Sequence, residues 1–109
     1  MKLQAERAGA DLVIRCLGDR IDAAGAVPFK DQILQLAQEG GARVRLDLSQ
    51  VGFLDSSGLG ALVAIRRLLG DRPLDLLFPT PPVMRVLRLT RMDMVFSIQH
   101  GQDADALRG

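Results

Sequence analysis

The chain has 109 residues, 48% of them hydrophobic, which is enough for one domain with a core of its own. Fourteen basic and 13 acidic residues leave a formal net charge of +1, which argues against nucleic acid or an anionic membrane as the main partner. One cysteine, Cys16, and one histidine, His100, exclude an internal disulfide and a zinc site of usual ligand spacing.

Neither the amino terminus nor the longest apolar stretch carries an export or membrane signal. Residues 1–7 lack the apolar segment of a secretion signal. The apolar run at 59–69 is interrupted by Arg66 and Arg67 and is too short to cross a bilayer. We therefore expect a cytoplasmic protein without membrane insertion, in which Cys16 is a small buried hydrophobic residue.

The first half of the chain predicts strands on both sides of one helix. Residues 11–17 are rich in apolar and β-branched side chains, and residues near Leu3 are expected to pair with them as an edge strand. Apolar residues recur at helical spacing from about 24 to 38, and the glycines at 40–41 end this helix. Residues 43–48 alternate strictly, which predicts a strand with one face toward the core.

The second half repeats this alternation of helix and strand. A helical stripe covers residues 59–69, residues 74–78 form a strand, and a third helix is expected to open just after Pro82. Residues 95–98 predict a last short strand. The polar tail from about residue 101 is expected to be disordered or to form a brief helix.

Together these elements predict a single α/β domain over residues 1–109. Their order favours an open, mixed, largely parallel sheet of four to five strands with right-handed crossover helices. In such sheets function lies at the carboxyl ends of the strands. Ser56 and Ser57 fall there, because they follow the strand at 43–48 and open the next helix.

Two interpretations of this serine pair are open. Asp55, Ser56 and Ser57 are all residue types that cap helices, since their oxygens accept hydrogen bonds from N–H groups left unpaired in the first turn. The same N–H groups and the helix dipole also favour a phosphate on a serine. Gly58 and Gly60 favour this second role, because each costs up to about 1 kcal/mol of helix stability and leaves the helix end open to a partner's backbone.

The sequence shows no catalytic machinery and no cofactor site. A nucleophile elbow reads Gly-x-Ser-x-Gly, which residues 54–58 do not match. Both glycine-rich phosphate-binding motifs are missing, and a lone tail histidine, His100, is more often exposed to solvent than a general base. We therefore expect a protein that is not an enzyme and that binds no cofactor or metal.

Other candidates carry less weight. Asp22 follows a strand and is either the cap of the first helix or a second site residue at the sheet edge of Ser56. The arginines and methionines toward the end of the chain are expected to form a solvated helix face and core filler, respectively: Arg85, Arg88 and Arg91, and Met84, Met92 and Met94.

Two consecutive segments resemble the signature of anti-sigma factor antagonists with the STAS fold. They are residues 44–51, VRLDLSQV, and residues 53–60, FLDSSGLG. The similarity covers nearly the whole chain, including residues 21–24 and 85–87. It implies a STAS fold in which a partner kinase phosphorylates Ser56.

The resemblance also implies partner switching. The unphosphorylated form would bind an anti-sigma factor and serine kinase of the histidine-kinase-like ATPase type and free the sigma factor, phosphorylation would end this binding, and a PP2C-type phosphatase would reset the switch. The chain departs from the family pattern at Asp19 and Arg91, where the family usually has glycine. These departures bear on the identity of the partner more than on the fold. The implied partner-binding residues are Asp22, Asp55, Ser56, Ser57, Gly58, Leu59 and Gly60.

The family also implies an alternative function. Some of its members are constitutive scaffolds or regulatory subunits of transporters and larger signalling complexes. In such a protein the segment Asp55-Ser56-Ser57 would be structural capping only.

Overall fold

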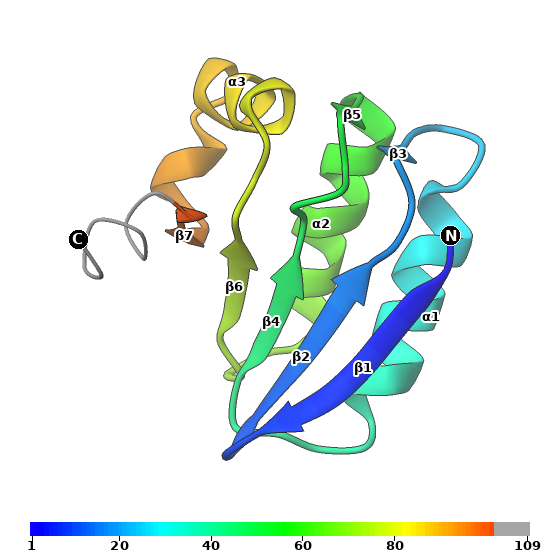
Figure 1. Ribbon diagram of the computed structural model, residues 1–109, viewed down its shortest axis with the longest axis vertical. Coiled ribbons are helices and arrows are strands. Elements are labelled where there is room, and N and C mark those ends of the chain that lie inside the picture. The colour runs from blue at the N-terminus through cyan, green and yellow to red at the C-terminus, as the bar shows by residue number, and fades with distance from the viewer. Residues whose placement is uncertain (102–109) are drawn as a thin grey trace.

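The computed structural model describes residues 1–101, which form a sheet covered by helices on one face (Figure 1). The strands are β1 (Leu3–Ala8), β2 (Asp11–Cys16), β3 (Arg20–Ile21), β4 (Val44–Asp47), β5 (Phe53–Leu54), β6 (Leu74–Leu77) and β7 (Ser97–Gln99). The helices are α1 (Ala26–Ala37), α2 (Ser56–Leu68), α3 (Pro81–Leu89) and the 3₁₀ turn η1 (Met92–Met94).

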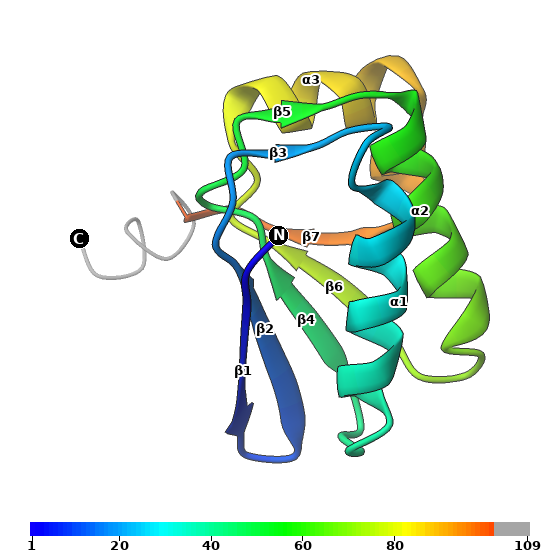
Figure 2. The same cartoon turned by 90° about the vertical axis from the view of Figure 1, so that its right-hand side faces the viewer.

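Five strands form the main sheet in the order β1-β2-β4-β6-β7. β1 pairs antiparallel with β2, and the other neighbours pair parallel, so the predicted mixed, largely parallel sheet is confirmed. α1 and α2 lie side by side on one face, while α3 lies beyond the carboxyl ends of the strands, next to β5 (Figures 1 and 2). This arrangement places the start of α2 at the carboxyl-end edge of the sheet.

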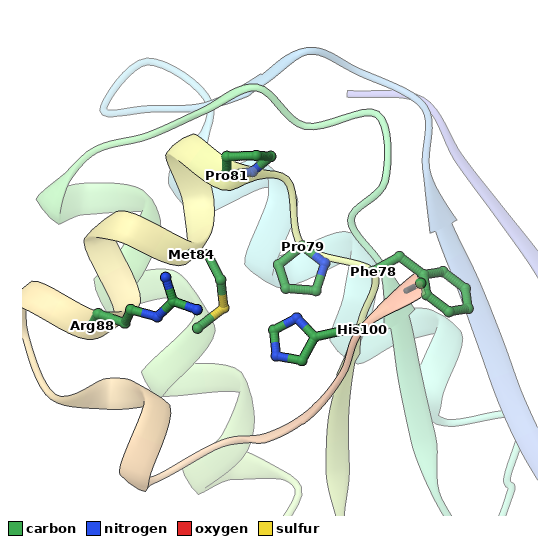
Figure 3. A pocket seen from close by; sticks show the side chains of 7 residues that line it. Phe78, Pro79, Pro81, Met84, Arg88 and His100 are labelled. Atoms are coloured by element: carbon green, nitrogen blue, oxygen red, sulfur yellow. The ribbon is translucent and has the colours of Figure 1, made fainter. Parts of the chain in front are cut away.

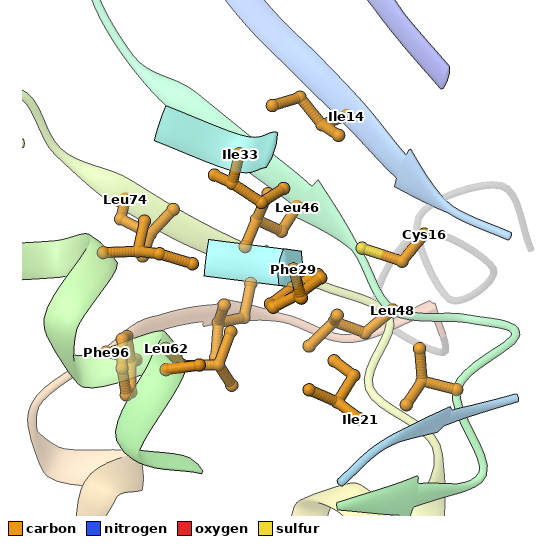
Figure 4. Packing of buried hydrophobic residues seen from close by; sticks show 14 of the residues in the cluster. Ile14, Cys16, Ile21, Phe29, Ile33, Leu46, Leu48, Leu62, Leu74 and Phe96 are labelled. Atoms are coloured by element: carbon orange, nitrogen blue, oxygen red, sulfur yellow. The ribbon is translucent and has the colours of Figure 1, made fainter. Parts of the chain in front are cut away.

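The core lies between the sheet and the two helices. The alternating residues Val44, Leu46 and Leu48 are fully buried on the central part of the sheet, as their spacing predicts. Figure 4 shows Phe29 and Ile33 pointing from α1 into the same cluster. Burying each such side chain contributes about 1.5–3 kcal/mol, which fixes α1 and α2 against the sheet.

On the opposite face of the sheet, a buried aspartate interacts with two arginines of the neighbouring strand region. Asp75 on β6 is only 2% exposed, and its two carboxylate oxygens accept hydrogen bonds of 2.8 and 2.9 Å from Nη1 of Arg43. Nε of Arg45 lies 3.3 Å from the same carboxylate. The hydrogen bond and charge of Asp75 raise the pKa of the Arg43 guanidinium above its usual value. Within the described residues, the buried Asp75 carboxylate is thus hydrogen-bonded by Arg43 and further neutralised by the charge of Arg45, whose Nε makes no hydrogen bond.

Arg72 closes the loop that follows α1. Its guanidinium donates to the carbonyl oxygens of Ala37, Gly40 and Gly41 at 2.8, 2.8 and 3.0 Å. Gly40 and Gly41 have φ angles of 101° and 108°, which favour glycine, and they end the helix as predicted. An arginine from the α2–β6 connection therefore binds the last carbonyl of α1, which also accepts from the N–H of Gly40, and two carbonyls of the loop that follows.

Several predicted boundaries shift. α1 begins at Ala26 and not at about residue 24. α3 begins at Pro81 and not after Pro82, because the first two positions of a helix need no backbone N–H and both accept proline. The last strand is Ser97–Gln99, since Arg91 in a left-handed conformation, with φ of 60°, is followed by the 3₁₀ turn. β3 and β5, with two residues each, were not predicted, because two residues show no alternation.

Side-chain exposure tests the remaining structural predictions. Cys16 is buried, and burial, followed by the charge of Asp47, raises the pKa of its thiol to about 12. The predicted core role is right for Met84, which is buried, but wrong for Met94, which is 81% exposed on the 3₁₀ turn. Met92 is half-buried. The predicted solvated helix face is confirmed for Arg85 and Arg88, whereas Arg91, also exposed, lies beyond the end of α3.

Two further expectations concern membrane insertion and the carboxyl-terminal tail. Among the described residues, no helix combines the length and the apolarity that a membrane span requires. The expected disordered tail or brief terminal helix falls on residues 102–109, which lie outside the described part of the chain.

Candidate functional site

The start of α2 is capped by Asp55. The backbone of Asp55 is extended, with φ of −102° and ψ of −173°, and its Oδ1 accepts a hydrogen bond of 2.9 Å from the N–H of Gly58. Its carbonyl oxygen accepts the first intrahelical bond, from Leu59, also at 2.9 Å. This geometry is that of an N-cap residue. The capping function therefore belongs to the aspartate and not to either serine.

Ser56 and Ser57 occupy the first two helical positions after this cap. Both side chains are exposed, and within residues 1–101 neither hydroxyl takes part in a hydrogen bond. The N–H groups of these two positions have no acceptor inside the helix. The site thus presents two free hydroxyls at the positive end of a helix dipole, where a phosphate is favourable.

A second segment of chain meets the helix start. β3 and β5 form a short parallel ribbon in which Ile21 pairs with Leu54. Beyond it, Oδ2 of Asp55 accepts a hydrogen bond of 3.1 Å from the N–H of Ala23. One carboxylate therefore contacts both the first turn of α2 and the β3–α1 connection, although 32 residues separate Asp55 from Ala23.

The two glycines of the motif have different surroundings. A Cβ on Gly58 would lie 2.2 Å from the carbonyl oxygen of Ile21 and 2.7 Å from a methyl group of Leu54. The prediction that Gly58 leaves room for a partner's backbone is therefore wrong, because this chain's own backbone already fills that room. At Gly60, by contrast, a Cβ would have no neighbour within 4 Å among the described residues, so this part of the helix surface is open.

Asp22 lies in the turn after β3. Its carboxylate is 3.6 Å from Nη1 of Arg20, and its side chain is 23% exposed. The N-cap residue of α1 is Gly25, which has no side-chain cap in the described part of the chain, so the interpretation of Asp22 as that cap is wrong. The predicted shared edge with Ser56 is what the structure shows, since the next residue, Ala23, bonds to Asp55.

Sequence reasoning missed an exposed pair beside this turn. The guanidinium of Arg20 lies over the ring of Phe53, 5.1 Å from its centroid, and Phe53 is 44% exposed. The two residues face each other because they pair across the β3–β5 ribbon. Only the aromatic residue at the start of the segment 53–60 could have signalled it.

A shallow groove of about 300 Å³ runs from Ser57 between α1 and α2. Small apolar side chains form most of its wall, and half-buried Leu59 lies on the same helix start. The residues that line it are Ala23, Ala26, Val27, Lys30, Ser57, Gly60, Ala61 and Ala64.

His100 belongs to a different place. It lines a hollow of about 450 Å³ with Phe78, Met84 and Arg88, between α3 and the end of β7 (Figure 3). No residue of the serine motif lines this hollow, so His100 is not placed to act as a base for Ser56. Among residues 1–101, no group of three or more His, Cys, Asp or Glu side chains could hold a metal ion.

The fold and the capped serine site define an α/β domain of the STAS type. A family model described as "Mlab, STAS domain" matches residues 3–98, and the chain accordingly belongs to the STAS domain family. The resemblance noted in the sequence, and the STAS fold that it implies, are confirmed.

Solved structures of anti-sigma factor antagonists are similar in fold. One from Mycobacterium paratuberculosis has a TM-score of 0.81 at 27% identity, over 98% of this chain and 91% of that one. SpoIIAA in its unphosphorylated form has a TM-score of 0.67 at 23% identity, over 99% and 97% of the two chains. Bacillus SpoIIAA in the phosphorylated form has a TM-score of 0.63 at 20% identity, over 99% and 100%.

Proposed function

We propose that this chain is a cytoplasmic anti-sigma factor antagonist that switches partners through phosphorylation of Ser56. The observation that carries the proposal is the free, exposed hydroxyl of Ser56 on a helix that Asp55 already caps. Unphosphorylated, the chain binds an anti-sigma factor that is also a serine kinase of the histidine-kinase-like ATPase type, and a sigma factor is released. The similarity in fold to anti-sigma factor antagonists supports this partner class.

The switch itself is electrostatic. The kinase transfers the γ-phosphoryl group of ATP to Oγ of Ser56, with ADP as the leaving group and the hydroxyl proton released. The phosphate adds a charge of about −1.5 to −2 next to the carboxylate of Asp55. Free N–H groups at the helix start accommodate this charge, so the domain stays folded. A partner surface shaped for a neutral hydroxyl then loses several kcal/mol of binding free energy.

The binding surface consists of the turn after β3 and the first turns of α2. Asp22, Ser56, Ser57 and Gly60 contribute exposed or half-buried surface, and Leu59 is half-buried beside them. Gly58 is buried, so its contribution is to let the two segments approach each other. The chain has no role in removing the phosphate, and a PP2C-type phosphatase acts on it in trans.

A second candidate function is a constitutive STAS scaffold or regulatory subunit of a transporter or larger complex. The observation in its favour is that the matching family model is described for Mlab and not for an anti-sigma factor antagonist. In this case the same surface binds its partner permanently, and the Ser56 hydroxyl is a contact and never a phosphoacceptor.

One experiment separates the two functions. The intact mass of the protein recovered from its own cells is measured before and after phosphatase treatment, with the modified residue mapped by fragmentation. Partner switching predicts a phosphate on Ser56 that is lost in Ser56→Ala and kept in the matched control Ser57→Ala. Absence of phosphate in every growth state, together with stable co-purification with membrane components, supports the scaffold instead.

A further inference from the structure

The carboxylate of Asp55 holds two segments at once. Oδ1 accepts from the N–H of Gly58 at 2.9 Å, and Oδ2 accepts from the N–H of Ala23 at 3.1 Å. A simple N-cap needs only the first of these hydrogen bonds. The second one leaves the helix and fixes the turn that carries Asp22.

Few other contacts fix this turn. The ribbon behind it has only two residues in each strand, and the hydrogen bond from the N–H of Asp55 to the carbonyl of Ile21 is long, at 3.4 Å. Ala23 and Ala24 are exposed. Beyond them, the N–H of Gly25 donates at 3.1 Å to the carbonyl of Asp22, a contact within the turn itself. The bond from Ala23 to Asp55 is therefore the main polar contact that ties the turn to α2.

We propose that Asp55 is a positioning residue that couples the phosphorylation state of Ser56 to the turn at Asp22, an inference that rests on the proposed function. A phosphate on Ser56 lies on the residue next to Asp55, and it is drawn to the free N–H groups at the helix start, beside the N–H of Gly58 that the carboxylate binds. Repulsion between the two negative groups weakens the hold of the carboxylate on the N–H of Ala23. The turn is released, and the surface changes in charge at α2 and in shape at Asp22.

The test follows the amide of Ala23 by NMR in the isolated full chain. Phosphoserine is introduced at position 56 by chemical synthesis, so the experiment needs no kinase. We expect phosphoserine to speed the amide hydrogen exchange of Ala23 about tenfold, the effect of losing one hydrogen bond. Asp55→Asn has a similar effect without phosphate, because an amide has one oxygen where the carboxylate has two. In this variant phosphoserine adds little further, since both changes act on one bond.

Controls keep the test specific. The single oxygen of Asn can turn toward the N–H of Ala23 and keep that hydrogen bond. Asp55→Ala removes both acceptors and therefore frees the Ala23 amide in either case. Asp47→Asn is the matched control, because Oδ1 of Asp47 accepts from the N–H of Ser49 at 2.9 Å in a turn away from the ribbon. It changes Ser49 and leaves Ala23 as it was. Unchanged exchange at Leu62 and Ile65, both in the core, shows that each variant is folded.

The results also distinguish the inference from the proposed function. If the Ala23 amide does not respond to phosphoserine, or responds equally in the chain with Asp55→Asn, the coupling through Asp55 is refuted, whatever Ser56 does in the cell. If Ala23 responds as expected but the protein carries no phosphate in any growth state, the coupling stands and the proposed function fails. In the supported case, Asp22→Ala and Asp55→Asn weaken binding of the kinase non-additively.

Discussion

Replacing Gly58 by alanine tests whether the helix start is built around a close backbone contact. The added Cβ would lie 2.2 Å from the carbonyl oxygen of Ile21. Carbon and oxygen atoms in weak contacts are ordinarily about 3.3 Å apart, so the overlap is about 1 Å. A methyl group of Leu54 would lie 2.7 Å from the same Cβ, and the atom of closest approach is a backbone oxygen, which cannot rotate aside. Either β3 moves or α2 does.

The expected cost exceeds the gain in helix propensity. Alanine is favoured over glycine within a helix by up to about 1 kcal/mol. Overpacking of this kind costs about 1–3 kcal/mol or more, and displacing β3 also strains the hydrogen bond between Ala23 and Asp55. We expect Gly58→Ala to lower the free energy of unfolding by about 2 kcal/mol.

Gly60→Ala is the matched control, because it places the same methyl group in open space two residues further along the same helix. We expect it to raise the free energy of unfolding by up to about 1 kcal/mol. Urea unfolding measures both variants, and thermal unfolding checks them. The two variants differ by about 2–3 kcal/mol, and at about 4–8 °C per kcal/mol for a domain of this size their midpoints differ by about 8–24 °C. Equal stability of the two variants would refute the packing argument.

Three further predictions concern single side chains. Arg72→Lys removes the guanidinium that donates to the carbonyls of Ala37, Gly40 and Gly41. We expect it to lower the free energy of unfolding, measured with urea, by about 2 kcal/mol. Because the pKa of the Cys16 thiol is raised to about 12 from 9.0, its contribution to stability is complete below pH 9 and is lost as the pH rises toward 12. A pH series of unfolding midpoints should show this loss, and Cys16→Ala should abolish it. Phe53→Ala leaves the fold intact but weakens binding of the proposed anti-sigma kinase about tenfold, because it removes an exposed ring beside the proposed binding surface. Calorimetry measures this, with Phe78→Ala, in the hollow next to α3, as the control.

The sequence predicted elements whose pattern is local. The strict alternation at 43–48 leaves only one arrangement in which Val44, Leu46 and Leu48 are all buried, and the structure has it. The helix after the serines was predicted correctly for the same reason, because its apolar residues recur at helical spacing. β3 and β5 could not be predicted, because a ribbon of two residues in each strand is stabilised by contacts distant in sequence and not by its own pattern.

At the candidate site, too, local features could be predicted from the sequence and contacts distant in sequence could not. That a cap and two hydroxyls occur at the start of α2 was evident from residue types alone. Which oxygen makes the cap was not, because aspartate and serine are equally good capping residues and only the geometry of Asp55 decides between them. The role of Gly58 was predicted wrongly, since its neighbour is the carbonyl of Ile21, which no local pattern reveals.

The assignment of the cap to Asp55 bears on how a switch at this site can work. If a serine hydroxyl made the cap, phosphorylation would remove the hydrogen bond that starts the helix, and the two states would differ in stability. With Asp55 as the cap, Ser56 is left without a structural task and is exposed. A phosphate there changes the charge of the surface and the partners of one carboxylate, while the core beneath α2, at Leu62 and Ile65, keeps its packing. Such a separation lets the domain pass between two binding states without unfolding, which a reversible switch requires.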